Sequence, residues 1–488
     1  MERKESGKKS SALNNHNEMK VLINKLLQIS AVPQEKDVSK LLENHKDMTV
    51  IIETIKKLQK KVVTEDKNRT SGRTCPAIIE RFTNWFKENG AELEGCDIRE
   101  IENYGLGFIT NTKIPEFSLV ISVPKKLMLT VDAAKKTPLK QLIEKDDLLG
   151  NMPNITLAVF LLYEKYKSES FWKPYIDILP NTYNTVLYFT VDELLELKGS
   201  PTFEKALCIN KCIIRQFAYF YKLFNTSEDS VSHIMRKRFS FEDYCWAVSS
   251  VMTRQNKVPS ENGITRIDAL IPLWDICNHM NGTITTDYNP DLKRCECLAL
   301  KTYQPGEQFF IFYGERSNAE LFLYNGFVYE ENEHDIYWIQ LGISKDDPLR
   351  EQRTELLKMF SFELNESFFL TKDGEPINDG ILKFIYIFKM NQEHLEYWLK
   401  SEGYNFSLCL NIQESWSFLQ TRLKLLLGTY KTTIEEDLKL LQEEQLSPNR
   451  KLAIRMRLTE KMILKKGIDY ADRMIERNAI ESIEKIQI

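Results

Sequence analysis

The stretches ALIPLWDICNHM (269–280) and EQFFIFYGERSNAELFLYNGF (307–327) place polar side chains inside strongly apolar sequence. Asn278, His279 and Tyr313 are the clearest cases. An unpaired polar group in buried surroundings costs about 1–3 kcal/mol, so an ordinary core would not favour these residues there. The pattern predicts a functional site.

The stretch WAVSSVMTRQN (246–256), which lies just upstream, ends in Arg254 and Asn256 after a helix-like apolar run. Further upstream, Gly105-Leu106-Gly107 follows ENY on a turn between strand-like segments. Glycine lets the backbone approach a ligand closely. The third glycine and the following helix of a dinucleotide fingerprint are missing, so a plain glycine hairpin remains an open alternative.

Composition narrows the possible classes of protein. The 488 residues exceed what one hydrophobic core usually organises, which predicts two or three domains, and 42% hydrophobic with 28% charged residues is typical of globular chains. The net charge of −4 offers no general attraction for nucleic acid. Because no apolar run is long enough to span a bilayer and the N-terminus has no apolar signal segment, we expect a protein that binds no membrane. It should act in the cytosol, or in both cytosol and nucleus.

The cysteines and histidines do not predict a metal site. Nine cysteines, an odd number without an export signal, favour reduced thiols. The pairs Cys295/Cys297 and Cys208/Cys212 lack a second Cys or His pair that would complete a zinc site. His279 is the histidine that stands in an apolar context.

The periodicity of the sequence predicts an α+β fold in which helices interrupt a β-rich region. We expect an N-terminal flanking segment over 1–72, a β-rich half over 73–130, a helical insertion over 131–245, a second β-rich half over 246–335 and a mostly α-helical C-terminal domain over 336–488. The C-terminal helices carry no ligand-type cluster, so we expect them to pack or bind rather than catalyse.

Apolar residues spaced three and four apart over 21–29 and 48–62 predict amphipathic helices in the flanking segment, after a disordered head. An aromatic stripe from Phe217 to Phe224 has helical spacing and is typical of core.

The run from Asp275 to His279 and the sequence Phe312-Tyr313-Gly314 have two interpretations each. Asn and His side chains can hold an adenine edge or brace a buried turn, and a tyrosine at a strand end can project into a cleft or belong to the core. Each signal alone leaves both alternatives open.

The chain resembles the SET-domain protein methyltransferases whose SET domain is split by a helical insertion. The resemblance rests on the joint order of five motifs: G-L-G, R-Q-N, D-x-x-N-H, F-Y-G and N-A-E-L-F-L-Y-N-G-F. That class also has a helical C-terminal domain similar to the substrate-binding domain of Rubisco lysine methyltransferase. Through LIPLWDICNH, ITTDYN, RCECLAL and TYKTTIEED, the chain is most similar to the branch that methylates a histidine of actin. The resemblance covers about residues 73–488 and implies a monomer.

The resemblance implies S-adenosyl-L-methionine as the cofactor. The residues that match the family's cofactor site are Tyr104, Gly105, Leu106, Arg254, Asp275, Ile276, Cys277, Asn278, His279, Asn325, Gly326 and Phe327. Asn325 departs from the pattern, since the family has Ser there. The family also places an arginine on the cofactor carboxylate, and Arg73 is the candidate, although the alignment there is loose by about two residues.

Methyl transfer needs alignment, desolvation and electron-rich groups around the methyl, and no metal. A lysine acceptor with a pKa of about 10.4 must lose a proton at a cost of about 4.6 kcal/mol at pH 7, whereas a histidine near about 6.5 is already mostly neutral. Histidine instead needs one tautomer, which an amide oxygen can select by accepting the ring N–H.

In the histidine branch an asparagine fills this role, and Asn256 matches it, with Trp274 as a pocket wall and Tyr313 orienting the ring. His279 matches the cofactor wall and is expected to be structural, not a base. Two alternatives remain: a protein-lysine methyltransferase of the same fold, and a degenerate SET scaffold that only binds partners.

Overall fold

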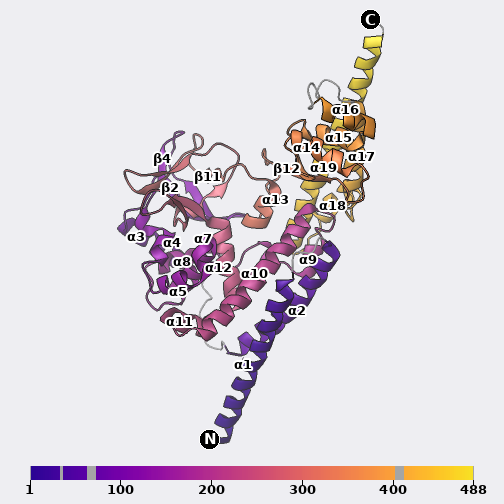
Figure 1. Ribbon diagram of the computed structural model, residues 1–488. Coiled ribbons are helices and arrows are strands. Elements are labelled where there is room, and N and C mark those ends of the chain that lie inside the picture. The colour runs from indigo at the N-terminus through magenta and orange to yellow at the C-terminus, as the bar shows by residue number, and fades with distance from the viewer. Residues whose placement is uncertain (1, 33–36, 63–72, 402–411, 487–488) are drawn as a thin grey trace. The chain divides into compact units, whose positions relative to one another are not determined.

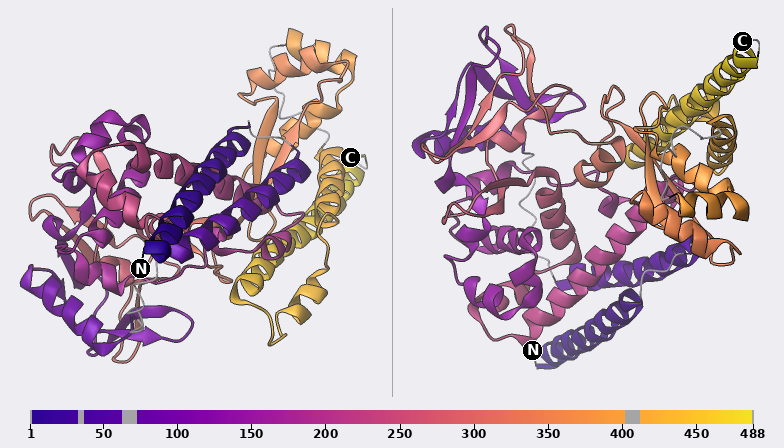
Figure 2. Two further views of the ribbon diagram at one scale, coloured as in Figure 1. Left: turned by 90° about the horizontal axis from the view of Figure 1, so that it is seen from below. Right: turned by 45° about the horizontal axis from the view of Figure 1, so that its top comes forward.

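The computed structural model describes residues 2–32, 37–62, 73–401 and 412–486, which form two compact units (Figures 1 and 2). The first unit comprises 1–188, 204–314 and 323–326. The second comprises 189–203, 315–322 and 327–488.

One sheet of the first unit joins the two β-rich halves of the sequence. Its strand order is β2 (Cys96–Ile101), β3 (Gly105–Thr110), β11 (Gln308–Ile311) and β8 (Asn278–His279). The strand β11 pairs antiparallel with β3 and parallel with β8, so strands about two hundred residues apart lie side by side. The helical block from 131 to 245 is thus inserted into a continuous β structure, which confirms the α+β prediction.

Two further sheets complete the β structure of this unit. One has the order β1 (Glu92–Leu93), β4 (Leu119–Pro124), β10 (Arg294–Leu298), β9 (Thr286–Asn289), and the other β5 (Leu129–Thr130), β7 (Arg266–Leu270), β6 (Asn256–Pro259). On β10, Cys295 and Cys297 share the buried face, and burial raises the pKa of the Cys295 thiol to about 12.

The insertion is built around α7 (Pro153–Tyr166), which is buried on nearly all sides because its sequence is apolar all round. It packs against α12 (Phe241–Arg254). Lys165 pairs with Asp243 at the start of α12, and the Tyr166 hydroxyl donates to the same carboxylate at 2.8 Å. These contacts fix the helix whose last residue is Arg254.

Outside the flanking segment, the other helices of the first unit are shorter than α7, apart from α10. They are α3 (Pro76–Glu88), α4 (Val131–Ala134), α5 (Lys140–Lys145), α6 (Asp147–Asn151), α8 (Lys173–Ile178), α10 (Pro201–Thr226) and α11 (Ser230–Arg238), with short helical turns at η1 (Lys125–Leu127) and η2 (Val186–Tyr188). The phenylalanines of the aromatic stripe on α10 lie in the core, where Phe217, Phe220 and Phe224 are fully buried, whereas Tyr219 is 37% exposed.

The flanking segment is more helical than expected. The stretches 21–29 and 48–62 lie inside α1 (Glu2–Ala31) and α2 (Val38–Val62), which run beside each other along α10 (Figures 1 and 2). Because α1 begins at Glu2, its helix also covers the stretch for which a disordered head was expected, and that expectation stays a prediction. Residues 63–72 lie outside the described part.

The second unit is mostly helical, as predicted. It contains α9 (Val191–Leu195), α13 (Asn318–Glu320), α14 (Arg350–Met359), α15 (Gly380–Lys389), α16 (Gln392–Lys400), α17 (Ile412–Leu427), α18 (Ile434–Leu440) and α19 (Pro448–Ile486). The antiparallel pair β12 (Ile336–Gly342) and β13 (Asn365–Thr371) was not expected. Alternate burial of Tyr337, Ile339 and Leu341 is the period-two pattern that marks this strand.

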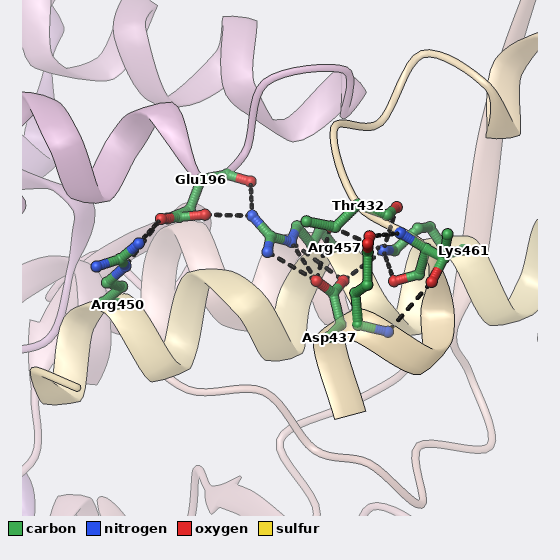
Figure 3. Close-up of polar contacts among 8 residues, drawn as sticks. Glu196, Thr432, Asp437, Arg450, Arg457 and Lys461 are labelled. Atoms are coloured by element: carbon green, nitrogen blue, oxygen red, sulfur yellow. Dashed lines mark hydrogen bonds and ion pairs between the residues drawn. The ribbon is translucent and has the colours of Figure 1, made fainter. Parts of the chain in front are cut away.

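Residues 189–203, which the sequence assigned to the insertion, group with the second unit through a buried ionic network (Figure 3). Arg457 on α19 donates to Asp437 on α18 at 2.7 Å and also pairs with Glu196, next to α9. Lys461 pairs with the same Asp437. A completely buried carboxylate therefore sits between two buried cations.

Within the described ranges, no helix is long and apolar enough to cross a membrane. The same residues contain no group of three or more His, Cys, Asp or Glu side chains placed to hold a metal ion.

Candidate active site

The turn Gly105-Leu106-Gly107 and the run from Asp275 to His279 lie in contact in the first unit. The Asn278 side chain donates from Nδ2 to the Leu106 carbonyl at 3.3 Å. A Cβ on Gly107 would lie 2.7 Å from the same Nδ2, so a side chain at 107 would displace the amide. Leu106 is buried, and what it offers to the site is its main chain. The glycine turn is thus part of the site.

Gly105 lies under the side chain of Arg73. Its φ is +75°, and a Cβ there would lie 2.4 Å from Arg73 Nη2. Burial lowers the pKa of Arg73, and the nearby charge of Arg254 lowers it further. Among the described residues, no carboxylate forms an ion pair with this guanidinium. The arrangement suits an anionic ligand group, as expected of Arg73.

Tyr104 stands at the edge of this turn. Its side chain is 49% exposed, and its ring packs edge-on against Phe310 of β11 with 5.8 Å between centroids. It is therefore available to a ligand, as the prediction requires.

His279 is held by the backbone that precedes Gly314. The Tyr313 N–H donates to His279 Nδ1 at 3.1 Å, so Nδ1 is an acceptor and the neutral ring carries its proton on Nε2. The His279 ring stacks on Phe312 and is 6% exposed. This geometry supports a structural role rather than a general base.

Tyr313 is held at both ends. Besides its N–H contact with His279, its hydroxyl donates to the Cys277 carbonyl at 2.6 Å. Cys277 and Ile276 are buried and contribute main chain here. These two contacts bring Tyr313 together with the run from Asp275 to His279.

Arg254 and Asp275 form the electrostatic centre of the site. Arg254 Nε lies 3.8 Å from Asp275 Oδ2, and the Asp275 side chain is 2% exposed, against 16% for Arg254. Burial raises the pKa of Asp275 to about 6, against the opposing effect of Arg254. Its Oδ1 is buried without a hydrogen-bond partner among the described residues.

Two residues of this centre were missed from the sequence. The Tyr175 hydroxyl donates to Asp275 Oδ2, and the Arg254 guanidinium lies 5.5 Å from the centroid of the Tyr183 ring. Both tyrosines occur in FWKPYIDILPNTYNT (171–185), whose Pro and Asn punctuation predicted only a break between helices. The available signal for a buried polar contact was the hydroxyl of Tyr175, which stands in an otherwise apolar segment.

Asn256 begins β6, directly after α12. Its side-chain Nδ2 donates to the Arg254 carbonyl at 3.1 Å, while Oδ1 has no hydrogen-bond partner among the described residues. In the sheet, Asn256 lies opposite Ala269 of β7. The amide is therefore oriented by its own turn, with its acceptor oxygen available.

Trp274 lies in the short turn η3 (Trp274–Ile276) and is 6% exposed. The preceding Leu273 has φ 74° and ψ −57°, a conformation that costs about 1–3 kcal/mol in a residue with a side chain. Such strain is common at ligand sites, and here it sets the direction in which the chain enters Trp274 and Asp275.

The last predicted group consists of Asn325, Gly326 and Phe327. The Asn325 side chain, at the end of the π-helical turn η4 (Leu321–Asn325), donates to the Thr253 carbonyl at 3.4 Å. Gly326 has φ +78°, and a Cβ there would lie 3.0 Å from the backbone of Asn184. Phe327 belongs to the second unit, where its N–H donates to Leu321.

Comparison with known structures identifies the fold. The SET domain of LSMT bound to lysine and AdoHcy superposes with a TM-score of 0.66 at 20% identity, covering 82% of this chain and 92% of that chain. Rubisco LSMT bound to AdoMet gives 0.64 at 21% identity, with 82% and 92% covered. Residues 344–464 match the family model described as Rubisco LSMT substrate-binding. The fold is that of the SET-domain methyltransferases with this C-terminal domain.

Curated relatives give the narrower assignment. The actin-histidine N-methyltransferases of Gallus gallus and Homo sapiens are each 39% identical to this chain over 478 residues, covering 96% of this chain and 79% of theirs. The chain therefore belongs to the actin-histidine N-methyltransferase family. The resemblance predicted from the sequence motifs is confirmed.

Proposed function

We propose that this chain transfers the methyl group of S-adenosyl-L-methionine to the tele ring nitrogen of a histidine in actin. Family membership supports the reaction class and the substrate. The single structural observation that carries the choice of acceptor is the fixed amide of Asn256, whose oxygen is left to accept a ring N–H.

The residues of the first unit fit the cofactor. Arg73, half-buried and without a carboxylate ion-pair partner among the described residues, suits its carboxylate, and Arg254 contributes a second positive charge nearby. Tyr104 and the Gly105-Leu106 main chain offer the adjoining surface, as do Asn278 and His279. The bound cofactor supplies a methyl on a sulfonium, so positive charge moves from sulfur to the acceptor nitrogen during transfer.

The protein's task is then to present a neutral imidazole with one nitrogen free. Asn256 Nδ2 donates to the Arg254 carbonyl, so Oδ1 faces the substrate. There Oδ1 accepts a hydrogen bond from the ring nitrogen that carries the proton, and the lone pair of the other ring nitrogen points toward the methyl. Trp274 walls the pocket. The Tyr313 hydroxyl donates its proton to the Cys277 carbonyl, and this bond fixes the orientation of its electron-rich oxygen. No general base is required for a ring that is already neutral.

The deciding experiment incubates the purified chain with unmethylated actin and methyl-labelled S-adenosyl-L-methionine, and locates the label by mass spectrometry. A single labelled histidine is expected. Label on lysine would replace the proposal with a protein-lysine methyltransferase, and cofactor retention without transfer would point to a binding scaffold.

We also propose that the enzyme acts as a monomer in the cytosol, or in both cytosol and nucleus. The buried cysteines form no disulfide in the structure, which supports a reducing compartment; they are Cys96, Cys245, Cys277, Cys295 and Cys297. Light scattering of the purified chain and imaging of a tagged copy test the two parts separately.

A further inference from the structure

Tyr175 is a fully buried tyrosine that the proposed reaction does not use directly. It lies on α8 inside the helical insertion, a hundred residues from the Asp275 carboxylate to which its hydroxyl donates. Burial raises its pKa well above the usual value, and the neighbouring Asp275 charge adds to this, so the hydroxyl keeps its proton and acts as a donor.

The oxygen that accepts this bond is also the one that faces Arg254. Arg254 Nε lies 3.8 Å from Asp275 Oδ2, and on another side the guanidinium packs on the Tyr183 ring. Its Nη1 donates to the Thr253 hydroxyl at 2.8 Å. Arg254 is thus held from several directions, and Asp275 is its one anionic partner among the described residues.

Asp275 itself depends on Tyr175. The carboxylate is buried, its Oδ1 has no hydrogen-bond partner among the described residues, and its contact with Arg254 is longer than a hydrogen bond. Among the described residues, Tyr175 therefore provides the one side-chain hydrogen bond that orients this carboxylate.

We propose that Tyr175 is a positioning residue for the cofactor site: by fixing Asp275, it sets the orientation in which Arg254 meets the anionic end of S-adenosyl-L-methionine. This rests on the proposed function. It means that the helical insertion, through α8, takes part in cofactor recognition and does more than enlarge the core.

The test is calorimetric titration of S-adenosyl-L-methionine into the wild-type chain and Tyr175→Phe, without actin. The variant removes one hydroxyl, and we expect binding to weaken by about three- to tenfold, as for loss of a hydrogen bond to a charged group that acts through one intermediary. The matched control is Tyr244→Phe, which also removes the hydroxyl of a fully buried tyrosine, bonded to Gln216 at 2.8 Å, near the opposite end of α12. It should bind the cofactor as wild type does.

A pH series adds a measurement that a purely structural role would not change. The groups that face Asp275 are Tyr175, Arg254, Arg73 and Tyr183. Because the Tyr175 hydroxyl stabilises the ionised carboxylate, its loss raises the pKa of Asp275 above about 6, and the pH dependence of binding in Tyr175→Phe should move upward from that of wild type. The cofactor's own titration is common to both proteins and cancels in this comparison.

Equal affinity and equal pH dependence in wild type and Tyr175→Phe would overturn the inference while leaving the proposed function intact. Failure of the wild-type chain to bind the cofactor would instead defeat the proposed function. If Tyr175→Phe does not fold, Asp275→Asn serves as the second variant, since it keeps the shape of the intermediary without its charge. Wild-type affinity in that variant would also overturn the inference.

Discussion

The side-chain amide of Asn256 is tied to the main-chain carbonyl of Arg254, two residues earlier, with 3.1 Å between Nδ2 and oxygen. The turn that ends α12 thereby orients a side chain at the start of β6. One local structure consequently places both Arg254, a candidate cofactor-binding residue, and Asn256, the candidate residue for orienting the substrate histidine.

Replacing Asn256 by Phe should weaken histidine methylation by about a hundredfold and shift preference toward lysine. The variant removes the oxygen that selects the imidazole tautomer, and loss of one oriented polar contact at a reacting centre typically costs 10²–10³ in rate. The assay compares actin peptides carrying His or Lys at the target position. Phe at the exposed Asn151 is the control. Unchanged histidine activity in Asn256→Phe would refute the assigned role.

Replacing Arg73 by Ala should weaken S-adenosyl-L-methionine binding by about tenfold or more, because a charged hydrogen-bonding partner of the ligand is worth about 1.5–3 kcal/mol. Titration calorimetry measures this directly. Arg81→Ala is the matched control, since Arg81 is 55% exposed and pairs with Asp177 on α8. An unaffected Arg73→Ala would show that another residue holds the carboxylate.

Replacing Arg457 by Met should destabilise the second unit by about 3–5 kcal/mol, because Asp437 would lose one of its two buried cations. The Arg450 side chain, by contrast, is 48% exposed where it pairs with Glu196. Losing that pair in Arg450→Met should therefore lower the free energy of unfolding by at most about 1 kcal/mol. Urea unfolding followed by fluorescence measures both. Figure 3 shows both arginines. Equal effects of the two substitutions would contradict the argument that the buried pair of Arg457 with Asp437 contributes more than the exposed pair of Arg450 with Glu196.

The raised pKa of Glu460 leads us to expect that the free energy of unfolding falls as the pH rises. Burial raises the pKa of this carboxyl to about 7, although the Thr202 and Tyr430 hydroxyls donate to it at 2.7 and 3.0 Å. The unfolded chain therefore loses this proton from about pH 4.5 upward, while the folded chain keeps it until about pH 7. Between those values folding stability should fall by about 3 kcal/mol, at about 1.4 kcal/mol per pH unit.

The measurement for Glu460 is urea unfolding at pH 5 and pH 7.5 for wild type and Glu460→Gln. The amide cannot ionise, so this contribution to the fall should vanish and the variant should be the more stable of the two at pH 7.5. An identical pH dependence in both proteins would mean that Glu460 titrates normally.

Local sequence predicted those parts of the site that are built from short motifs. The sequence D-x-x-N-H and the glycine turn were recognised separately, and the Asn278 contact with the Leu106 carbonyl joins them. Hydrophobic periodicity was sufficient for the inserted helices and the C-terminal helices, because burial on one face or on all faces is written directly into the residue order.

Long-range polar contacts were not predictable in this way. The bond from Tyr175 to Asp275 spans a hundred residues, and Glu196 meets Arg457 across 261. Neither partner has a distinctive neighbour in sequence, so the network and the grouping of α9 with the second unit emerge only from tertiary packing. The strand β13 was missed for another reason: its apolar residues form a run too short to separate from helix by periodicity.

Asn325 stands where related enzymes are expected to have Ser, and its amide reaches the Thr253 carbonyl at 3.4 Å. The hydroxyl of a serine lies one bond closer to Cβ than the Asn amide nitrogen does, so from an unchanged backbone it would fall short of this already long contact. The substitution thus adds a cross-brace between the last turn of α12 and the turn that leads into Gly326. Exchange to Ser would be expected to loosen that brace first, visible as faster amide hydrogen exchange in these two segments before any change in overall melting.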